Sequence, residues 1–247
     1  MPSIARKRRG CGNGVQQNIS RGLPAIYGGG VENEFDMIVT SPPYNFGGFN
    51  REGKKRSYDT YSDDMPDDDY KRWIKQVLDA CAKALKPGGV LYWNHKGKYV
   101  NGTFYPPFFI IDLCELNLYQ HIIWHYNSGP DVQPIKFFPR HEEIFLFSKG
   151  KPAYFNKDCA GLGDVWYIAH GYDKVHPAPF PLSLARRAIS ASCPPGGVVY
   201  DPFMGSGTTA LAAIQEKVNF VGTEISERYI KYANERIGIK QSQLTLF

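Results

Sequence analysis

Short apolar segments alternate with longer segments of helical periodicity along most of this chain. The first apolar segment, Phe35–Thr40, reads FDMIVT and stops at a proline pair, as a buried strand does. The next segment, Asp67–Lys86, repeats apolar residues at helical spacing and ends at a Pro-Gly-Gly triplet. Strands that alternate with helices form a mostly parallel sheet covered on both faces. The chain is therefore predicted to have an α/β fold.

The same alternation continues to residue 237. Further helices are expected over residues 104–116, 182–192, 208–216 and 227–237. Further strands are expected over residues 90–94, 118–126, 143–148, 198–200 and 220–223. The strands 118–126 and 143–148 follow each other without a helix between them, so we expect them to form an antiparallel pair.

One large domain is expected over residues 21–239. The length of 247 residues, 43% of them hydrophobic, suffices for one core and is short for two. A basic, flexible arm is expected over residues 1–20 and a short tail over 240–247. No apolar run approaches the ~20 residues of a membrane span. The five cysteines are isolated and form no CxxC pair, so we expect a metal-free protein of the reducing cytoplasm.

Charged residues gather in three places. The net charge of +5 is compatible with a polyanionic partner without identifying one. Two basic groups could contact phosphates: Arg6, Lys7, Arg8 and Arg9 in the arm, and Arg51, Lys54, Lys55 and Arg56 in the loop after the first strand. For the group in the arm, a solvated tail is an equally good explanation. The acidic group consists of Asp63, Asp64, Asp67, Asp68 and Asp69. These carboxylates could hold a metal, but we prefer a position at a helix N-terminus, where the helix dipole favours negative charge.

A glycine-rich turn, DPFMGSGTT over residues 201–209, follows one strand and opens a helix. Glycines let the backbone approach a ligand, and a helix N-terminus offers free N–H groups to a carboxylate or a phosphate. The turn lacks the lysine of a nucleotide-triphosphate loop. Glu224 ends the next strand, where a carboxylate can accept both hydroxyls of a ribose. S-adenosylmethionine, a nucleoside that carries a carboxylate, suits both features, and its candidate ligands are Asp201, Phe203, Gly205, Ser206, Gly207, Thr208 and Glu224.

The tetrapeptide Ser41-Pro42-Pro43-Tyr44 follows the strand 35–40. Prolines stiffen the backbone and carry no N–H, so the carbonyl oxygens here are expected to have no partner within the chain. An exocyclic base amine is a poor nucleophile because its lone pair is delocalised into the ring. Acceptors on its two hydrogens favour a tetrahedral nitrogen, and the tyrosine ring can stack on a flipped-out base. Taken alone, however, such a tetrapeptide is an ordinary strand end.

Together, the two motifs resemble those of the amino-methyltransferases of DNA restriction-modification systems and of related solitary enzymes. In that family an S/N/DPPY tetrapeptide is catalytic and an FxGxG turn binds S-adenosylmethionine. The matching residues are Ser41, Pro42, Pro43 and Tyr44 for the first motif and Phe203, Gly205 and Gly207 for the second. The catalytic motif comes first, as in the permuted beta class. The segment that begins His176-Pro177 resembles the part of that class that lines the cofactor pocket, and Arg140-His141-Glu142 resembles another recurring piece.

The resemblance extends from about Phe35 to Ile237. It implies a Rossmann-like, S-adenosylmethionine-dependent methyltransferase fold and methyl transfer to a flipped-out base of double-stranded DNA. Cytosine N4 is the expected acceptor, because Ser41 is neutral where the adenine enzymes more often carry aspartate. Adenine N6 stays an alternative, since some adenine enzymes carry serine.

The residues of the chain also bear on three other classes of protein. An RNA-directed enzyme remains an alternative. A non-catalytic DNA-binding homologue would be expected to lose Ser41, Tyr44 or Glu224, and all three are present. A cytosine-C5 enzyme needs a thiolate nucleophile, usually in a Pro-Cys pair, and no cysteine here follows a proline.

Two further regions bear on partners. The target-recognition region, expected over residues 149–175, is short. Specificity would therefore depend also on the loop 46–62 or on a second subunit in a homodimer, or would be limited to a few base pairs.

The C-terminal residues QLTLF resemble the pentapeptide by which many bacterial proteins dock on the replication sliding clamp. Such docking would use Gln243, Leu244, Leu246 and Phe247 and implies a nucleoid-associated protein. Folding of the tail back onto the domain explains its apolar residues equally well.

Overall fold

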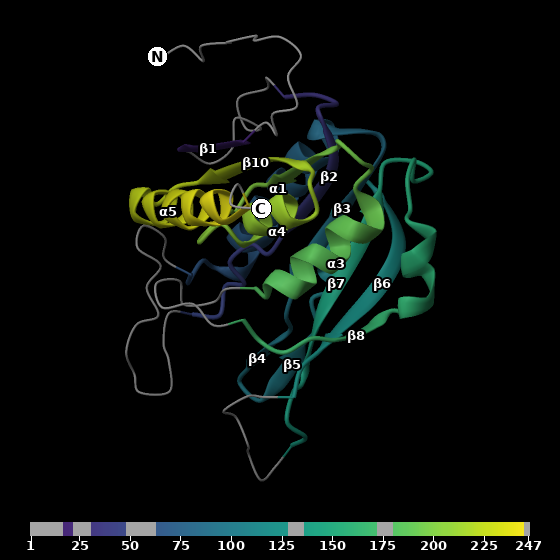
Figure 1. Ribbon diagram of the computed structural model, residues 1–247. Coiled ribbons are helices and arrows are strands. Elements are labelled where there is room, and N and C mark those ends of the chain that lie inside the picture. The colour runs from purple at the N-terminus through teal and green to yellow at the C-terminus, as the bar shows by residue number, and fades with distance from the viewer. Residues whose placement is uncertain (1–16, 22–30, 48–62, 128–135, 172–179, 245–247) are drawn as a thin grey trace.

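The computed structural model describes residues 17–21, 31–47, 63–127, 136–171 and 180–244. One eight-stranded sheet runs through the molecule, with helices on both of its faces (Figure 1). Its strands, in spatial order, are β1 (Gln17–Arg21), β10 (Asn219–Glu224), β9 (Val198–Asp201), β2 (Phe35–Thr40), β3 (Leu85–His95), β7 (His141–Ser148), β6 (Asn117–His125) and β8 (Val165–Tyr167).

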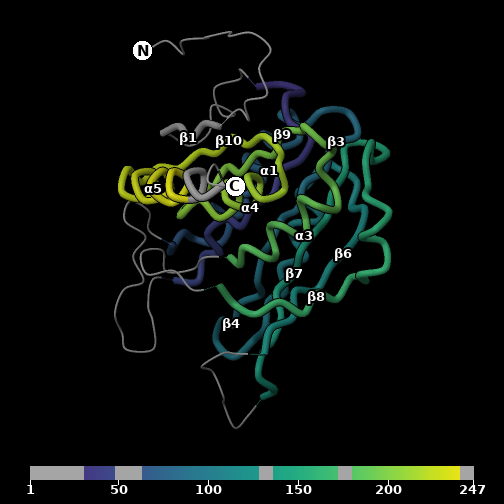
Figure 2. Tube along the Cα trace, viewed as in Figure 1, coloured from purple at the N-terminus to yellow at the C-terminus, as the bar shows by residue number. Residues whose placement is uncertain are grey.

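The first five strands in this order are parallel to their neighbours, from β1 through β10, β9 and β2 to β3. The next strand, β7, is antiparallel to both β3 and β6, and β8 pairs in parallel with β6 at the edge. The expected α/β fold, with a mostly parallel sheet and an antiparallel pair, is confirmed. β1, from near the start of the chain, lies beside β10 and contacts the C-terminal helix (Figure 1). Figure 2 shows the backbone passing from β10 into that helix.

Two hydrophobic cores lie on opposite faces of the sheet. Side chains alternate between faces along a strand, so Val90 and Tyr92 of β3 join one core while Leu91 and Trp93 join the other. The first core packs against α3 (Leu182–Ser192) and α4 (Thr208–Gln215). The second packs against α1 (Asp67–Ala84) and α2 (Phe109–Leu113). The last helix, α5 (Glu227–Leu244), contacts α4, β10 and β1.

The expected helix over residues 104–116 is largely wrong. The strands β4 (Lys98–Val100) and β5 (Thr103–Tyr105) form an antiparallel hairpin, and only Phe109–Leu113 are helical. Asn101 and Gly102 connect the two strands with φ values of +49° and +80°. Positive φ at both central residues is the signature of the type I′ turn that Asn-Gly favours. This local signal directly precedes the expected helix, and the hairpin that it forms places Phe104 and Tyr105 in β5.

The ends of the domain also differ from expectation. Residues 17–20 of the expected flexible arm belong to β1, and the backbone of the expected tail is helical as far as Leu244. The region 149–175 contains a short 3-10 helix (Lys157–Leu162) and β8. The rest of the arm, the basic loop residues 51–56, and Leu246 and Phe247 lie outside the described residues.

Among the helices in the described ranges, none has both the length and the apolar character that a membrane span requires.

Gly207, which precedes α4, generates a prediction about stability. Its φ is +84°, and a Cβ added to it would lie 2.9 Å from the Cβ of Ala233 in α5. Gly207→Ala is expected to lower the free energy of unfolding by roughly 2–5 kcal/mol, from left-handed strain and overpacking together. Gly102→Ala is the matched control, because Gly102 has φ +80° but no atom within 4 Å of an added Cβ. Urea denaturation of both variants should show a clearly larger loss at Gly207, and equal losses would contradict the packing argument.

Candidate active site

The carboxyl ends of three neighbouring parallel strands form one edge of the sheet. In the order β10-β9-β2, these strands end at Glu224, Asp201 and Thr40, respectively. The Ser41–Tyr44 turn therefore begins beside the glycine turn, although the two are far apart in the sequence. Ligands of open α/β sheets bind beyond this edge.

The carboxylate of Asp201 joins the two turns. Its Oδ1 accepts a hydrogen bond from Thr40 Oγ1 at 2.8 Å and from the Phe203 N–H at 3.0 Å, and its Oδ2 accepts from Thr209 Oγ1 at 2.6 Å. Asp201 is 2% exposed, and burial raises its pKa to about 6 against the opposing effect of these bonds. Both oxygens accept hydrogen bonds from protein donors, so the side chain holds the two turns together, and contact between Asp201 and the cofactor stays a prediction.

Glu224 holds the glycine turn from the neighbouring strand. Its Oε2 accepts from the Gly205 N–H at 2.8 Å and its Oε1 from the Ser226 N–H at 2.9 Å. Burial raises the pKa of Glu224, while these backbone bonds lower it. Gly205 and Gly207 both have positive φ, +50° and +84°, so the turn needs glycine at these positions. Ser206 and Thr208 are buried, while Phe203 is half-buried with its ring edge-on to Trp73 of α1.

The two proline carbonyls of the Ser41–Tyr44 turn differ in their contacts. The Pro43 carbonyl accepts a hydrogen bond from the Tyr70 hydroxyl at 2.7 Å, contrary to the expectation that the turn's carbonyls have no internal partner. In the part of the chain that the structure describes, no donor contacts the Pro42 carbonyl. Ser41 Oγ lies 2.7 Å from the Tyr44 hydroxyl, and the Tyr44 ring stays half-buried. Ser41 Oγ and the Pro42 carbonyl are thus two acceptors that this turn offers.

A buried histidine contacts the tyrosine that bonds to Pro43. Burial lowers the pKa of His95 to about 3, so the ring is neutral and carries one proton. Its Nδ1 lies 2.8 Å from the Lys96 N–H nitrogen and 2.9 Å from the Lys96 carbonyl oxygen, and its Nε2 lies 2.8 Å from the Tyr70 oxygen. The Pro43 carbonyl can only accept, so the Tyr70 hydroxyl directs its hydrogen to Pro43. His95 also packs against the Tyr44 ring, with a centroid distance of 4.6 Å.

Asp63 has a role that the sequence interpretation missed. It lies before α1, is 8% exposed, and accepts the N–H of Asn45 at 2.7 Å and of Phe46 at 3.3 Å. It therefore clamps the backbone that follows Tyr44 and does not occupy the helix N-terminus, where Asp67, Asp68 and Asp69 do lie. Asn45 has φ +58°, a left-handed conformation that this clamp supports.

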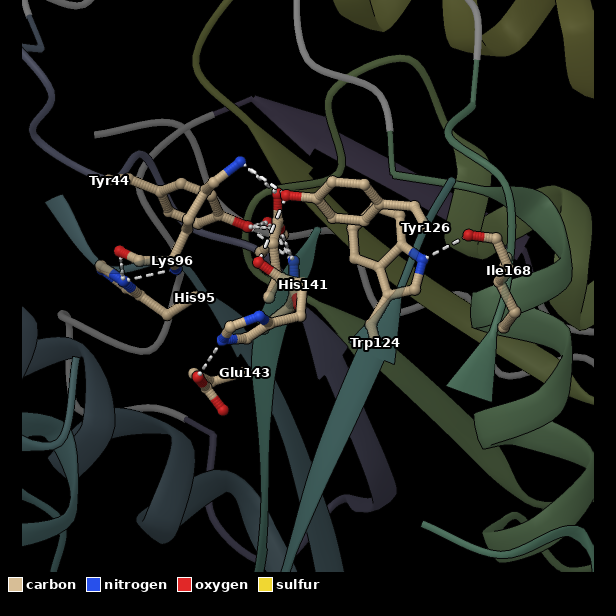
Figure 3. A network of polar contacts seen from close by, with 11 residues as sticks. Tyr44, His95, Lys96, Trp124, Tyr126, His141, Glu143 and Ile168 are labelled. Carbon is tan, nitrogen blue, oxygen red and sulfur yellow. Dashed lines mark hydrogen bonds and ion pairs between the residues drawn. The ribbon is translucent and has the colours of Figure 1, made fainter. Parts of the chain in front are cut away.

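Two further buried polar residues meet Tyr44 from neighbouring strands. Asn94, near the end of β3, donates from Nδ2 to the Tyr44 hydroxyl at 2.6 Å and to Glu142 Oε2 at 3.0 Å. Tyr44 also donates to Glu142 Oε2 at 3.0 Å. Figure 3 shows Tyr44, Lys96 and Tyr126 converging on this cluster; Lys96 Nζ lies 2.7 Å from the Tyr126 hydroxyl and 3.6 Å from Glu142 Oε1. The Arg140-His141-Glu142 resemblance pointed to this strand without a role for it, and Asn94 gave no signal at all.

Several expected site residues cannot be placed. His176 and Pro177 and both basic groups lie outside the described residues. Within the described ranges, no group of three or more His, Cys, Asp or Glu side chains is arranged to hold a metal ion.

The comparisons with known proteins agree on one family. A model of the DNA methylase family matches residues 35–235. The type II methyltransferase M.BglII of Bacillus subtilis is 29% identical over 90% of this chain, which spans 66% of the relative's length. The DNA adenine methyltransferase YhdJ of Escherichia coli strain K12 is 28% identical over 83% of this chain and 76% of its own length.

Solved structures of DNA methyltransferases share the fold. The cytosine-N4-specific PvuII DNA methyltransferase matches with a TM-score of 0.71 and 18% identity over 92% of each chain. The DNA modification methylase TTHA0409 of Thermus thermophilus, complexed with S-adenosyl-L-methionine, matches with a TM-score of 0.62 and 24% identity over 92% of this chain and 96% of that one.

The buried Asp201 generates a prediction about pH. Its pKa rises from 3.8 to about 6 in the folded protein, so the folded state holds this proton more tightly than the unfolded state. The contribution of the group to stability is therefore greatest at low pH and falls as the pH rises through this interval. Asp201→Asn should gain stability relative to the parent chain over the same interval, by up to about 3 kcal/mol. Urea denaturation at several pH values measures the difference, and a difference that does not depend on pH would contradict the burial argument.

Proposed function

The chain belongs to the DNA methylase family, and from that membership we propose that it transfers the methyl group of S-adenosylmethionine to an exocyclic base amine of double-stranded DNA. The observation that carries this proposal is the adjacency of the two turns, which the 2.8 Å bond between Thr40 and Asp201 holds together. A methyl donor on the glycine turn and a base on the Ser41–Tyr44 turn would meet at this edge of the sheet.

The glycine turn offers a site for each end of the cofactor. The Glu224 carboxylate accepts the backbone N–H groups of Gly205 and Ser226, and the roughly four acceptor positions of its two oxygens leave room for a ribose hydroxyl. The N-terminus of α4, reached through the left-handed Gly207, offers N–H groups to the cofactor carboxylate. The match to a neighbour solved with S-adenosyl-L-methionine supports this choice of cofactor.

The Ser41–Tyr44 turn offers what an amine nucleophile needs. Ser41 Oγ and the Pro42 carbonyl can accept the two amine hydrogens, which favours a tetrahedral nitrogen and directs its lone pair away from the ring. With S-adenosylmethionine bound, the nitrogen would bond to the methyl carbon as the carbon–sulfur bond breaks with its electron pair on sulfur, and the amine proton would pass to solvent. The base must leave the duplex to reach this turn, and the half-buried Tyr44 ring is available to stack on it.

Cytosine N4 is the acceptor that we propose, because Ser41 places a neutral hydroxyl at the first position of the turn. The likeness to the cytosine-N4-specific PvuII enzyme supports this choice. Adenine N6 is the second candidate, and the sequence similarity to the adenine enzyme YhdJ supports it.

Two partner proposals from the sequence stay predictions. A homodimer would extend the short recognition region. Docking on a replication sliding clamp would use Gln243, Leu244, Leu246 and Phe247. The backbone of Gln243 and Leu244 is the last part of α5, so an extended docking segment requires this end of the helix to unwind.

A pair of substitutions separates base binding from cofactor binding. Tyr44→Ala should abolish most turnover and leave S-adenosylmethionine affinity nearly intact, because base–aromatic stacking of roughly 1–3 kcal/mol is lost. Glu224→Ala should instead weaken cofactor affinity, since charge-assisted hydrogen bonds of roughly 1.5–3 kcal/mol are removed. Calorimetry with the cofactor and methyl transfer to duplex DNA measure the two effects. Equal losses of cofactor affinity in both variants would contradict the assigned division.

The product identifies the acceptor. DNA methylated by the purified protein is digested to nucleosides and the modified base is found by mass spectrometry. We expect N4-methylcytosine. N6-methyladenine as the only product would reassign the base without changing the reaction class, whereas methylation of structured RNA in preference to duplex DNA would overturn the proposed substrate.

A further inference from the structure

A buried carboxylate stands behind the Ser41–Tyr44 turn. Glu142, in β7, is 7% exposed, and its Oε2 accepts hydrogen bonds from both the Tyr44 hydroxyl and Asn94 Nδ2 at 3.0 Å. Its other oxygen faces the Lys96 ammonium at 3.6 Å. A buried carboxylate is costly unless charge and hydrogen bonds compensate it, and here both are supplied by residues around the proposed base site.

The charge of Glu142 determines which way the neighbouring hydroxyls point. An ionised carboxylate only accepts hydrogen bonds, so the Tyr44 hydroxyl directs its single hydrogen to Glu142. The Tyr44 oxygen therefore acts as the acceptor in its 2.7 Å contact with Ser41 Oγ, and Ser41 directs its hydrogen to Tyr44. Asn94 Nδ2 reinforces this order, because it donates to both Tyr44 and Glu142. Ser41 Oγ, which Asn94 Nδ2 contacts only at 3.4 Å, keeps a lone pair for a further donor.

We propose that Glu142 is a positioning residue for methyl transfer: through the hydroxyls of Tyr44 and Ser41, its negative charge orients and polarises the acceptor that binds the target amine. This inference rests on the proposed function. The chain of hydrogen bonds runs from the amine to Ser41 Oγ, from Ser41 to Tyr44, and from Tyr44 to Glu142. Hydrogen bonds in such a chain strengthen one another in a buried environment.

The effect is greatest in the transition state. The amine nitrogen gains positive charge as it attacks the methyl carbon, so its hydrogens become stronger donors at that moment. An acceptor polarised by a carboxylate then stabilises the transition state more than the bound substrate, which raises kcat with little effect on KM. Ser41 is neutral, and the negative charge lies two hydroxyl groups away at Glu142. Tyr44 has two functions in this arrangement, since its ring faces the base and its hydroxyl transmits the charge.

The test compares Glu142→Gln, Tyr44→Phe and the double variant. Each single substitution should lower the single-turnover rate of methyl transfer roughly ten- to a hundredfold, the range for replacing or disconnecting a charged acceptor. The KM for DNA and the affinity for S-adenosylmethionine should change by less than about threefold. The double variant should be no slower than the slower single variant, because either change already interrupts the chain.

Glu143→Gln is the matched control. Glu143 is the next residue of the same strand and is also 7% exposed, but it pairs with His121 and His141 rather than with Tyr44. The single-turnover rate of the Glu143→Gln variant should equal that of the parent chain.

Three outcomes would overturn the inference: an unchanged rate in Glu142→Gln, additive losses in the double variant, or a loss that appears only in KM or cofactor affinity. If Glu142→Gln melts at a much lower temperature than the parent, Tyr44→Phe decides alone, and a parent-like rate in that variant refutes the relay. A parent chain that methylates no nucleic acid would refute the proposed function instead.

Discussion

The pairing of β2 with β9 brings together two turns that are distant in the sequence. A hydrogen bond joins them between Thr40 and Asp201, which are 161 residues apart in the chain. Parallel strands end at the same edge of a sheet, so this one pairing places both turns on the same side of the molecule. Asp201 then fixes their relative position, because its carboxylate bonds to Thr40 on one side and to the start of α4, through Thr209, on the other. The remaining contacts of the site refine an arrangement that this junction creates.

Buried or half-buried carboxylates organise each part of the site. Asp201 joins the turns, Glu224 holds the glycine turn through Gly205, Asp63 clamps the backbone after Tyr44, and Glu142 contacts the Tyr44 hydroxyl. Burial raises the pKa of the first three, which shows that desolvation opposes their ionised forms. Each accepts hydrogen bonds from groups that it must hold in place, so rigidity at the site is obtained at a cost in electrostatic stability.

The scaffold tolerates wide sequence change around this site. At 18% identity, the match to the PvuII enzyme still has a TM-score of 0.71 over 92% of each chain. The two cores explain this tolerance, since the alternating side chains of β3 and β7 need only apolar partners of suitable volume from the helices. The site itself depends on individual polar atoms, for which there is no such latitude.

The sequence by itself determined the α/β fold, the strand β2 and the helix α3 to the residue, and the two motifs of the site. These are encoded locally, by apolar periodicity and by turn residues whose chemistry is legible in isolation. A local signal was also overlooked at Asn101-Gly102: the turn that Asn-Gly favours joins the strands of a hairpin, and the second strand takes up the first residues of an expected helix.

Only the tertiary structure decided which strands are neighbours, and hence which side chains converge. Asp63, Asn94 and Glu142 precede α1 or lie in different strands, and no periodicity or spacing relates them to Tyr44. The same holds for Tyr70, whose bond to Pro43 overturned the expectation of a free carbonyl. Hydrogen bonds between residues distant in the chain depend on strand order and register, which a single sequence does not specify, because many pairings satisfy the same apolar pattern.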